Sequence, residues 1–338
     1  MKRYELHDTN GIESLKVVEA AAPKPGPGQV LVRVRAVSLN YRDLLVVSGM
    51  YARGAMPLPM VPTSDGAGEV AEVGSGVDGL RVGDRVAGTF FAGWVSGQLT
   101  EREMATARGG ATQGMMSEYV LSGPEALVRI PGHLSFEDAA TLPCAALTAW
   151  HALFEVDPVR PGETVLVLGT GGVSVFALQL AVMAGAQVIV TSSSDEKLER
   201  ARALGATTTI NYKTTPNWEA PVREATSGRG VDRVMEVGGP GTFQKSLASL
   251  RMGGRLSLIG VLTGFAGGVE MVPILVGSLH VDGIYVGSRE MFESMNRAIT
   301  RAKLTPVIDR VFSFADAPAA YQHLRSGAHF GKVVIRID

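Results

Sequence analysis

The sequence has a single cysteine, no surplus of positive charge and no long uninterrupted hydrophobic segment. Among its 338 residues the one cysteine is Cys144, which excludes an intrachain disulfide framework and a multi-cysteine zinc module. Its 32 basic and 33 acidic side chains give a net charge of -1, which excludes a general nucleic-acid binder. The most apolar stretch, Val173–Val190, is interrupted by Gln179, Gly185 and Gln187 and therefore does not read as a membrane span.

The chain does have enough apolar material for a large core, together with many glycines. Hydrophobic residues make up 46% and charged residues 19%, which excludes intrinsic disorder. The 41 glycines are about 12% of the chain, against a usual ~7%, and tight turns near a ligand are one reason for such an excess. The charged start, Met1–Glu5, leads into no apolar signal sequence. We expect a soluble, cytoplasmic protein of two domains, with no nucleic-acid or membrane partner.

The pattern of predicted strands and helices changes along the chain. Early segments such as Gln29–Val37, Gly68–Val73 and Arg85–Gly88 predict a compact, barrel-like β module. From about residue 134 helices and apolar strands alternate, beginning with a capping box at Ser135–Asp138, which predicts a helix to Leu153 and then a doubly wound parallel α/β domain.

The β character returns near the C-terminus of the chain. We therefore expect the tail to complete the first domain, so that the nucleotide-binding domain is inserted within it. The expected domains are residues 1–128 with 305–338, and residues 129–304.

A glycine-rich turn between a buried strand and a helix is the strongest local motif. The apolar run Thr164–Leu168 leads directly into Gly169-Thr170-Gly171-Gly172-Val173-Ser174. Gly169 permits a sharp turn, and Gly171 lets a pyrophosphate approach the helix N-terminus. Ser174 replaces the usual third glycine but is small enough for close packing. The motif predicts dinucleotide binding.

The end of the next strand lacks the acid that NAD sites place there. That acid accepts a hydrogen bond from the ribose 2′-hydroxyl, whereas this chain has Ser192. Ser192, Ser193 and Lys197 can instead hold a 2′-phosphate, so we expect NADPH (NADP) as cofactor. Alternatively, Ser194 caps the following helix, and Asp195 and Glu196 complement its dipole; both interpretations can hold.

The chain resembles the medium-chain dehydrogenases/reductases, and within them the zinc-independent quinone oxidoreductase-like group. The segments that carry the resemblance are Ser38–Asp43, Gly66–Val70, Val82–Val86, Leu147–Trp150, Gly169–Val173, Arg202–Ala206 and Gly238-Gly239. The resemblance implies a GroES-like β-barrel catalytic domain, a Rossmann doubly wound parallel-sheet domain, an active-site cleft between them and nicotinamide-dependent redox chemistry.

The positions at which many members of this superfamily hold a catalytic zinc carry unsuitable side chains here. The resemblance places those positions on Asn40, Ser64 and Cys144. One thiolate cannot build a catalytic site that needs three protein ligands. The structural zinc lobe is also missing, because residues 90–116 contain no cysteine. We expect no metal, and a small buried role for Cys144.

Without a metal, the implied chemistry is hydride transfer to an activated double bond. Hydride reaches the β-carbon of an enone or quinone, and the enolate oxygen then needs only hydrogen bonds. The resemblance places Asn40, Tyr41, Ser64 and Asp65 beside the nicotinamide. Tyr41 and Ser64 are the expected donors to the substrate oxygen, and Asn40 is expected to orient it; the alternative for Tyr41 is a packing aromatic. Arg42 and Asp43 are expected to form a structural or cofactor-positioning pair.

The resemblance and the two motifs together assign a set of residues to the cofactor. In chain order these are Asn40, Thr148, Gly169, Gly171, Gly172, Val173, Ser192, Ser193, Lys197, Tyr212, Gly238, Gly260, Val261, Leu262, Ser288, Phe330 and Lys332. Thr148 and Ser288 are implied to lie near the nicotinamide, and Phe330 with Lys332 in the tail that crosses the cleft.

One long segment matches no motif of the family. Phe91–Met116 is expected to be either a mobile loop over the substrate cleft or a plain surface insertion, in which Trp94, Met115 and Met116 could line an apolar pocket.

The last strand of the nucleotide-binding domain carries a prediction about assembly. Leu279–Gly287 would expose an apolar sheet edge. The resemblance implies that two such edges meet in a homodimer.

These observations predict an NADPH-dependent oxidoreductase acting on a small-molecule carbonyl, enone or quinone. Two alternatives remain open. One is an alcohol dehydrogenase or aldehyde reductase that uses substituted ligands, and the other is a non-catalytic NADPH-binding protein.

Overall fold

The computed structural model describes residues 1–51 and 56–338, which fall into two compact units. Unit 1 comprises Met1–Leu147 and Val286–Asp338, and unit 2 comprises Thr148–Tyr285. Unit 2 is thus inserted in unit 1, but it is shorter at both ends than the expected range of 129–304.

Two helices account for this difference in boundaries. Helix α3 (Phe136–Ala140) packs against strands β3, β4 and β15 of unit 1. Helix α10 (Arg289–Ala302) packs against β7 of the same unit. Because a domain boundary falls where few contacts cross, both helices belong to unit 1.

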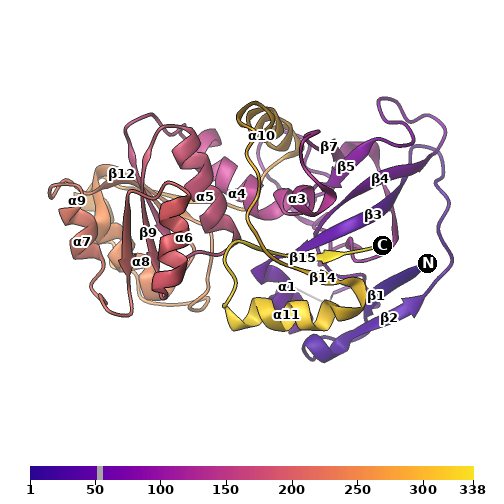
Figure 1. Cartoon of the computed structure of the whole chain (residues 1–338), viewed down its shortest axis with the longest axis horizontal. Coiled ribbons are helices and arrows are strands. Elements are labelled where there is room, and N and C mark those ends of the chain that lie inside the picture. The colour runs from indigo at the N-terminus through magenta and orange to yellow at the C-terminus, as the bar shows by residue number, and fades with distance from the viewer. Residues whose placement is uncertain (52–55) are drawn as a thin grey trace. The chain divides into compact units, whose positions relative to one another are not determined.

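Unit 1 is built on a seven-stranded sheet and contains both ends of the chain (Figure 1). The strand order is β14-β15-β3-β4-β5-β7, with β6 also paired to β3. The strands of unit 1 are β1 Lys2–Leu6, β2 Leu15–Glu19, β3 Val30–Leu39, β4 Asp65–Val73, β5 Arg85–Gly88, β6 Tyr119–Ser122, β7 Leu127–Arg129, β14 Ile308–Ser313 and β15 Lys332–Arg336. Its remaining helices are α1 Tyr41–Val47, α2 Glu101–Met104 and α11 Ala317–Ser326.

The centre of this sheet is buried on both faces. Val34 and Val37 of β3 join a core cluster with Val333 and Ile335 of β15 and with Tyr321 of α11. Burial of one such aliphatic side chain contributes roughly 1.5–3 kcal/mol. The packing therefore fixes the C-terminal strand beside β3.

The helix expected to reach Leu153 is divided into four short pieces. Ser135 caps α3 through the predicted capping box with Asp138. A π-helical turn, Leu142–Ala146, then separates α3 from α4 (Leu147–Trp150), and a second π-helical turn, His151–Glu155, follows. Pro143 has no N–H to donate, which is a physical reason for the irregularity.

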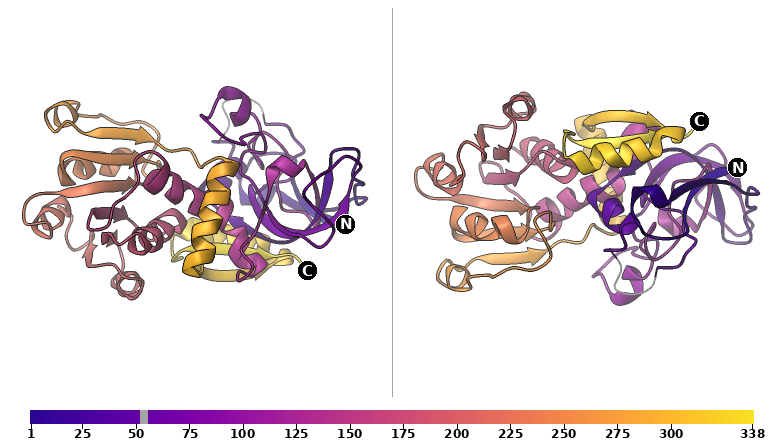
Figure 2. Two further views of the ribbon diagram at one scale, coloured as in Figure 1. Left: turned by 90° about the horizontal axis from the view of Figure 1, so that it is seen from above. Right: turned by 90° about the horizontal axis from the view of Figure 1, so that it is seen from below.

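Unit 2 contains a six-stranded parallel sheet in the order β10-β9-β8-β11-β12-β13. Helices α5 and α6 cover one face, and α7 and α8 cover the other (Figure 1). The elements are β8 Thr164–Leu168, α5 Gly172–Met183, β9 Gln187–Ser192, α6 Asp195–Ala203, β10 Thr208–Asn211, α7 Glu219–Glu224, β11 Val231–Glu236, α8 Pro240–Ser249, β12 Leu250–Leu258, α9 Val272–Val276 and β13 His280–Gly283. The predicted doubly wound domain is confirmed, and β13 lies at one edge (Figure 2).

Candidate active site

Three neighbouring strands bring the main polar residues of unit 1 together. In the antiparallel sheet Leu39 pairs with Val333 and Ser38 pairs with Asp65. The end of β3 therefore lies beside the starts of β4 and β15. The polar cluster of unit 1, as we define it, consists of Asn40, Ser64, Asp65, Cys144 and Lys332.

Lys332 places a buried ammonium group in this cluster. Its side chain is almost fully buried, and Nζ donates to the carbonyl oxygen of Leu39 at 2.6 Å and to Oδ1 of Asn40 at 2.5 Å. Burial lowers the pKa of Lys332, and the nearby Asp65 carboxylate opposes that shift. Within unit 1, two of the three Lys332 donors are thus used by the protein.

Asp65 is the carboxylate that balances this charge. It is completely buried, its Oδ1 accepts from Ser64 Oγ at 2.7 Å, and its Oδ2 accepts from the Cys144 amide at 3.1 Å. Burial raises the pKa of Asp65, while Lys332 and the hydrogen bonds oppose the rise. The hydroxyl hydrogen of Ser64 is therefore directed to Asp65.

The residue before Ser64 has a strained backbone. Thr63 has φ of 70°, a left-handed conformation that non-glycine residues rarely adopt. Its hydroxyl lies 3.1 Å from that of Tyr321, and a Cβ on Gly109 would lie 2.7 Å from the Thr63 backbone. Close packing by Gly109 holds Thr63, and with it the direction of Ser64.

Arg42 and Asp43 form the expected pair, and their contacts are structural. Arg42 NH1 lies 3.2 Å from Asp43 Oδ1 and donates to the carbonyls of Arg108 and Gly109, each at 3.0 Å. Asp43 Oδ2 accepts from the backbone N–H of Asn40 at 2.8 Å. The pair thus ties the start of α1 to the segment that packs on Thr63.

Exposure distinguishes the three residues predicted to be catalytic. Tyr41 is 41% exposed, whereas Asn40 is 8% exposed and Ser64 is fully buried. Tyr41 is therefore not a core aromatic, and it is the most exposed of the three.

The side chains of the cluster do not fit a zinc ion. No three His, Cys, Asp or Glu side chains within residues 1–51 and 56–338 come together as a metal site requires. A lysine ammonium also lies among them, and a cation of this kind is no metal ligand. Cys144 is only partly exposed, and burial raises the pKa of its thiol, which agrees with the expected small, largely buried role.

The glycine turn of unit 2 has the geometry that an anion site needs. Gly169 has φ of 72°, and Gly171 precedes α5 without any side-chain cap on that helix. Ser174 is buried and its Oγ donates to the carbonyl of Leu168 at 2.7 Å, tying the helix to β8. The free amides of the first turn therefore fit a pyrophosphate. Gly172 and Val173 form the first turn of α5 itself.

At the end of β9 the capping interpretation is confirmed. Ser194 Oγ accepts from the backbone N–H of Lys197 at 3.4 Å. Asp195 Oδ1 accepts from the Asn211 side chain at 2.8 Å. Asp195 thus has a partner in the protein. Ser192 is the last residue of β9, and its carbonyl accepts from the Tyr212 N–H at 3.0 Å.

Further predicted cofactor residues lie at this same carboxyl edge of the sheet, where doubly wound domains bind ligands. Ser193 follows β9, Tyr212 follows β10, and Gly260, Val261 and Leu262 follow β12. Leu262 is half exposed, and the Gly260 N–H donates to the carbonyl of Glu236 at 3.1 Å.

Sequence reasoning missed Glu236, which organises the loop after β11. This buried carboxylate accepts from the amides of Gly238 and Gly239 at 2.7 and 2.9 Å, and from Thr242 Oγ1 at 2.6 Å. The Gly238 amide therefore bonds within the chain. The sequence feature that could have indicated this role is an acid within the otherwise apolar run Val234–Val237.

The remaining predicted residues have local partners or are buried. Ser288 Oγ caps α10 by accepting from Met291 N–H at 3.2 Å. The Phe330 N–H donates to Asp309 Oδ1 at 3.0 Å, and its ring is buried. Thr148 is buried in α4.

The segment Phe91–Met116 is anchored rather than a free loop. Phe91 and Trp94 are buried, and the carbonyl of Trp94 accepts from Arg289 N–H at 2.9 Å. Met115 and Met116 belong to the core cluster of unit 1, so their expected role as pocket lining is wrong. These side chains face the core because their backbone pairs with Pro62 and Thr63.

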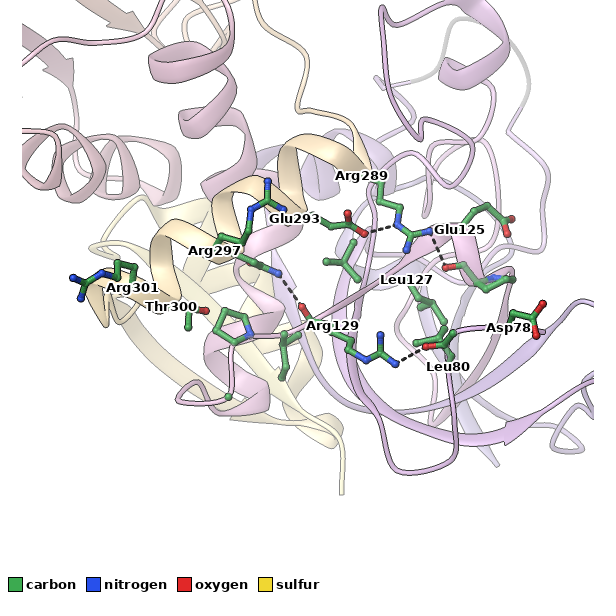
Figure 3. Close-up of a pocket in the computed structure, with 17 residues that line it drawn as sticks. Asp78, Leu80, Glu125, Leu127, Arg129, Arg289, Glu293, Arg297, Thr300 and Arg301 are labelled. Atoms are coloured by element: carbon green, nitrogen blue, oxygen red, sulfur yellow. Dashed lines mark hydrogen bonds and ion pairs between the residues drawn. The ribbon is translucent and has the colours of Figure 1, made fainter.

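Unit 1 also contains a hollow of about 940 Å³ beside α10. Figure 3 shows its charged residues, including Arg289, which pairs with Glu293 at 2.9 Å, and Arg129, which donates to the carbonyl of Gly79. None of the predicted site residues lines this hollow.

Comparison with known proteins places this architecture in a family. The family "Alcohol dehydrogenase GroES-like domain" matches residues 26–132, and the family "Zinc-binding dehydrogenase" matches residues 172–301. A zinc-type alcohol dehydrogenase-like protein of Schizosaccharomyces pombe is 46% identical, covering 99% of each chain.

Solved structures agree with this placement. An NAD-dependent alcohol dehydrogenase aligns over 100% of both chains with a TM-score of 0.91 and 35% identity. Escherichia coli quinone oxidoreductase complexed with NADPH aligns over 100% of both chains with a TM-score of 0.84 and 26% identity. The chain belongs to the medium-chain dehydrogenase/reductase superfamily, and it is an NAD(P)H-dependent oxidoreductase.

Across the part of the chain that the structure describes, no helix is both long and apolar enough to cross a membrane.

Proposed function

We propose that this protein is a zinc-independent, NADPH-dependent reductase of activated double bonds, acting on small enones or quinones. The observation that carries the proposal is the polar cluster of unit 1. It offers hydrogen-bond donors and a buried ammonium, and its side chains do not fit a zinc ion. Such a site stabilises a developing enolate by hydrogen bonding, whereas direct carbonyl reduction gains most from a Lewis acid.

In this proposal the chain's own residues hold the substrate oxygen and supply a proton. When bound, NADPH would supply the hydride for the new C–H bond at the β-carbon and would be oxidised to NADP, and the double-bond electrons would move toward the carbonyl oxygen. Tyr41, which is 41% exposed at the start of α1, donates the proton that completes the product. Asn40 and Ser64 provide polar groups beside the substrate oxygen.

The choice of NADPH is supported by the end of β9. An acid there would repel a 2′-phosphate, and Ser192 removes that repulsion while keeping a donor. Two acids, Asp195 and Glu196, follow in the first turn of α6, and the Asp195 carboxylate accepts a hydrogen bond from Asn211. Lys197, Ser193 and Tyr212 stand at the same edge and complete a site for a dianionic phosphate.

The edge of unit 2 supports a homodimer. Strand β13 ends the sheet, and α9 exposes Leu275 by 79%, Val276 by 68% and Val272 by 67%. Contiguous apolar surface of this kind marks an interaction site, and a second copy of the chain would extend the sheet across a twofold axis.

The test is NADPH oxidation by the purified protein with a panel of quinones, enones and aldehydes, with NADH alongside and zinc content measured. We expect turnover with enones or quinones, and no stoichiometric zinc. Zinc bound in equal amount and lost together with activity would instead establish the alcohol dehydrogenase alternative. Binding of NADPH without turnover of any compound would favour a non-catalytic protein.

A further inference from the structure

The Lys332 ammonium fixes which way the Asn40 amide faces. An ammonium group has donors and no acceptor, so the amide atom 2.5 Å from Nζ must be the oxygen, Oδ1. The amide nitrogen Nδ2 then lies on the opposite side of the planar group. Because Asn40 is 8% exposed, and its backbone N–H is held by Asp43 at 2.8 Å, the side chain has little freedom to turn over.

The side-chain nitrogen of Asn40 is a buried donor without a well-formed hydrogen bond. Nδ2 is inaccessible to water, and no described atom accepts a hydrogen bond from it with normal geometry. The Asp65 carboxylate lies close enough for the Asn40 amide to lower its pKa, but no hydrogen bond of normal geometry joins the two groups. A buried donor without a partner is unfavourable, and such groups persist where a ligand supplies the acceptor.

The ammonium group of Lys332, in turn, is bonded mainly to other groups of the protein. Two of its three donors are used by Asn40 and by the carbonyl of Leu39, and Asp65 balances its charge. Its strand, β15, is held between the edge strand β14 and β3. A side chain so placed acts through Asn40 rather than by contacting a cofactor phosphate.

We propose that Asn40 is the hydrogen-bond donor to the carbonyl oxygen of the substrate, and that Lys332 is the positioning residue that holds Asn40 in the donating orientation. The inference rests on the proposed reductase function and deepens it. It changes two expectations. Asn40 donates a hydrogen bond to the substrate rather than only orienting it, and Lys332 contacts Asn40 rather than the cofactor. The preferred ligand is therefore one with a carbonyl oxygen that gains negative charge during hydride transfer.

Two variants of Asn40 separate donation from mere contact with Lys332. Asn40→Ala removes the whole amide, whereas Asn40→Asp keeps an oxygen for Lys332 and removes the NH2 group. Removal of one such donor lowers kcat by about 100-fold in comparable sites. We expect a loss of this size in both variants, with unchanged NADPH binding. An Asn40→Asp protein that retains wild-type kcat would overturn the donor role.

Lys332→Met tests the positioning role, because it keeps side-chain length and removes the charge. We expect kcat for enone reduction to fall by about tenfold or more, while the Kd for NADPH changes by less than about twofold. In an Asn40→Ala background the same substitution should have almost no further effect, because residues that act as a unit are not additive. Lys24→Met, at an exposed position of the same unit, is the matched control.

The outcomes separate this proposal from the proposed function. A wild type that reduces nothing in the panel refutes the reductase function; crystal structures of the wild type and of Lys332→Met then decide the inference alone. A turned or disordered Asn40 amide in the variant supports it, and an unchanged amide overturns it. A raised Kd for NADPH with unchanged kcat would make Lys332 a cofactor ligand, which also overturns it. Should Lys332→Met fail to fold, the two Asn40 variants decide the donor role.

Discussion

The hydroxyl of Ser64 donates to the carboxylate of Asp65, with 2.7 Å between Oγ and Oδ1. Both residues are completely buried. Ser64 therefore stabilises the ionised form of a carboxylate whose pKa is raised by burial. The hydroxyl hydrogen of Ser64 is therefore used by Asp65. Ser64 can donate to a substrate only when its hydrogen bond to Asp65 is broken.

Ser64→Ala should consequently destabilise the protein in a pH-dependent way. Loss of the hydroxyl raises the pKa of Asp65 further, and a raised folded-state pKa favours stability at low pH and lowers it as pH rises through that pKa. We expect a loss of about 1–3 kcal/mol at pH 8 and a smaller loss at pH 4. Urea unfolding between these pH values measures it. Ser249→Ala, whose hydroxyl donates to the Lys245 carbonyl, is the control and should show a constant loss.

Cofactor preference should change with two substitutions at the end of β9. A hydrogen bond to a charged group contributes about 1.5–3 kcal/mol, so Lys197→Ala should weaken NADPH binding by roughly ten- to a hundredfold and leave NADH nearly unchanged. Ser192→Asp should reverse the preference toward NADH by repelling the 2′-phosphate. Binding constants for both cofactors decide the matter, with Lys245→Ala as a control. Equal weakening of both cofactors by Lys197→Ala would remove the main support for NADPH.

Asp232 should contribute stability that is lost in acid. Its carboxylate accepts from Arg229 at 2.6 Å, Arg251 at 2.5 Å and the Thr164 amide at 2.8 Å. Although burial alone would raise it, these donors hold the pKa of Asp232 well below its usual range. Such a group stabilises the fold above its unfolded-state pKa, and the contribution disappears as pH falls through the folded-state value.

We therefore expect Asp232→Asn to lower the free energy of unfolding by about 2 kcal/mol at pH 7. The difference from wild type should shrink as pH falls below about 4, where the unfolded aspartate takes up its proton. Asp78→Asn, at an exposed position, serves as control. A deficit that stays constant into acid would mean that packing, and not charge, explains the effect.

The proposed homodimer should depend on the exposed face of α9. Leu275→Lys places a charge in an apolar interface, and we expect it to convert a dimer into a monomer at micromolar concentration. Light scattering measures the change, and Val17→Lys, at an exposed position of unit 1, should leave the dimer intact. A wild type that is monomeric under these conditions would contradict the dimer itself.

Local patterns were sufficient for the nucleotide-binding sheet. The run Thr164–Leu168, the following glycine turn and the capping residue Ser194 each predicted the element found at that place. These features act over a few residues: apolar runs bury strands, and caps satisfy amides at a helix start. The presence of an oxidoreductase site and its candidate residues Asn40, Tyr41 and Ser64 came from motif resemblance.

The partners of those residues were decided by tertiary structure. Nothing near Lys332 in the sequence indicates that its ammonium meets Asn40, which lies 292 positions away. That contact exists because β15 pairs with β3, so that one strand's start lies beside the other strand's end. The same holds for Glu236, whose carboxylate folds back on its own loop, and for Met115 and Met116, which entered the core. Side-chain identity sets what a residue can bind, but strand pairing and burial decide which partner it meets and which group remains free for a ligand.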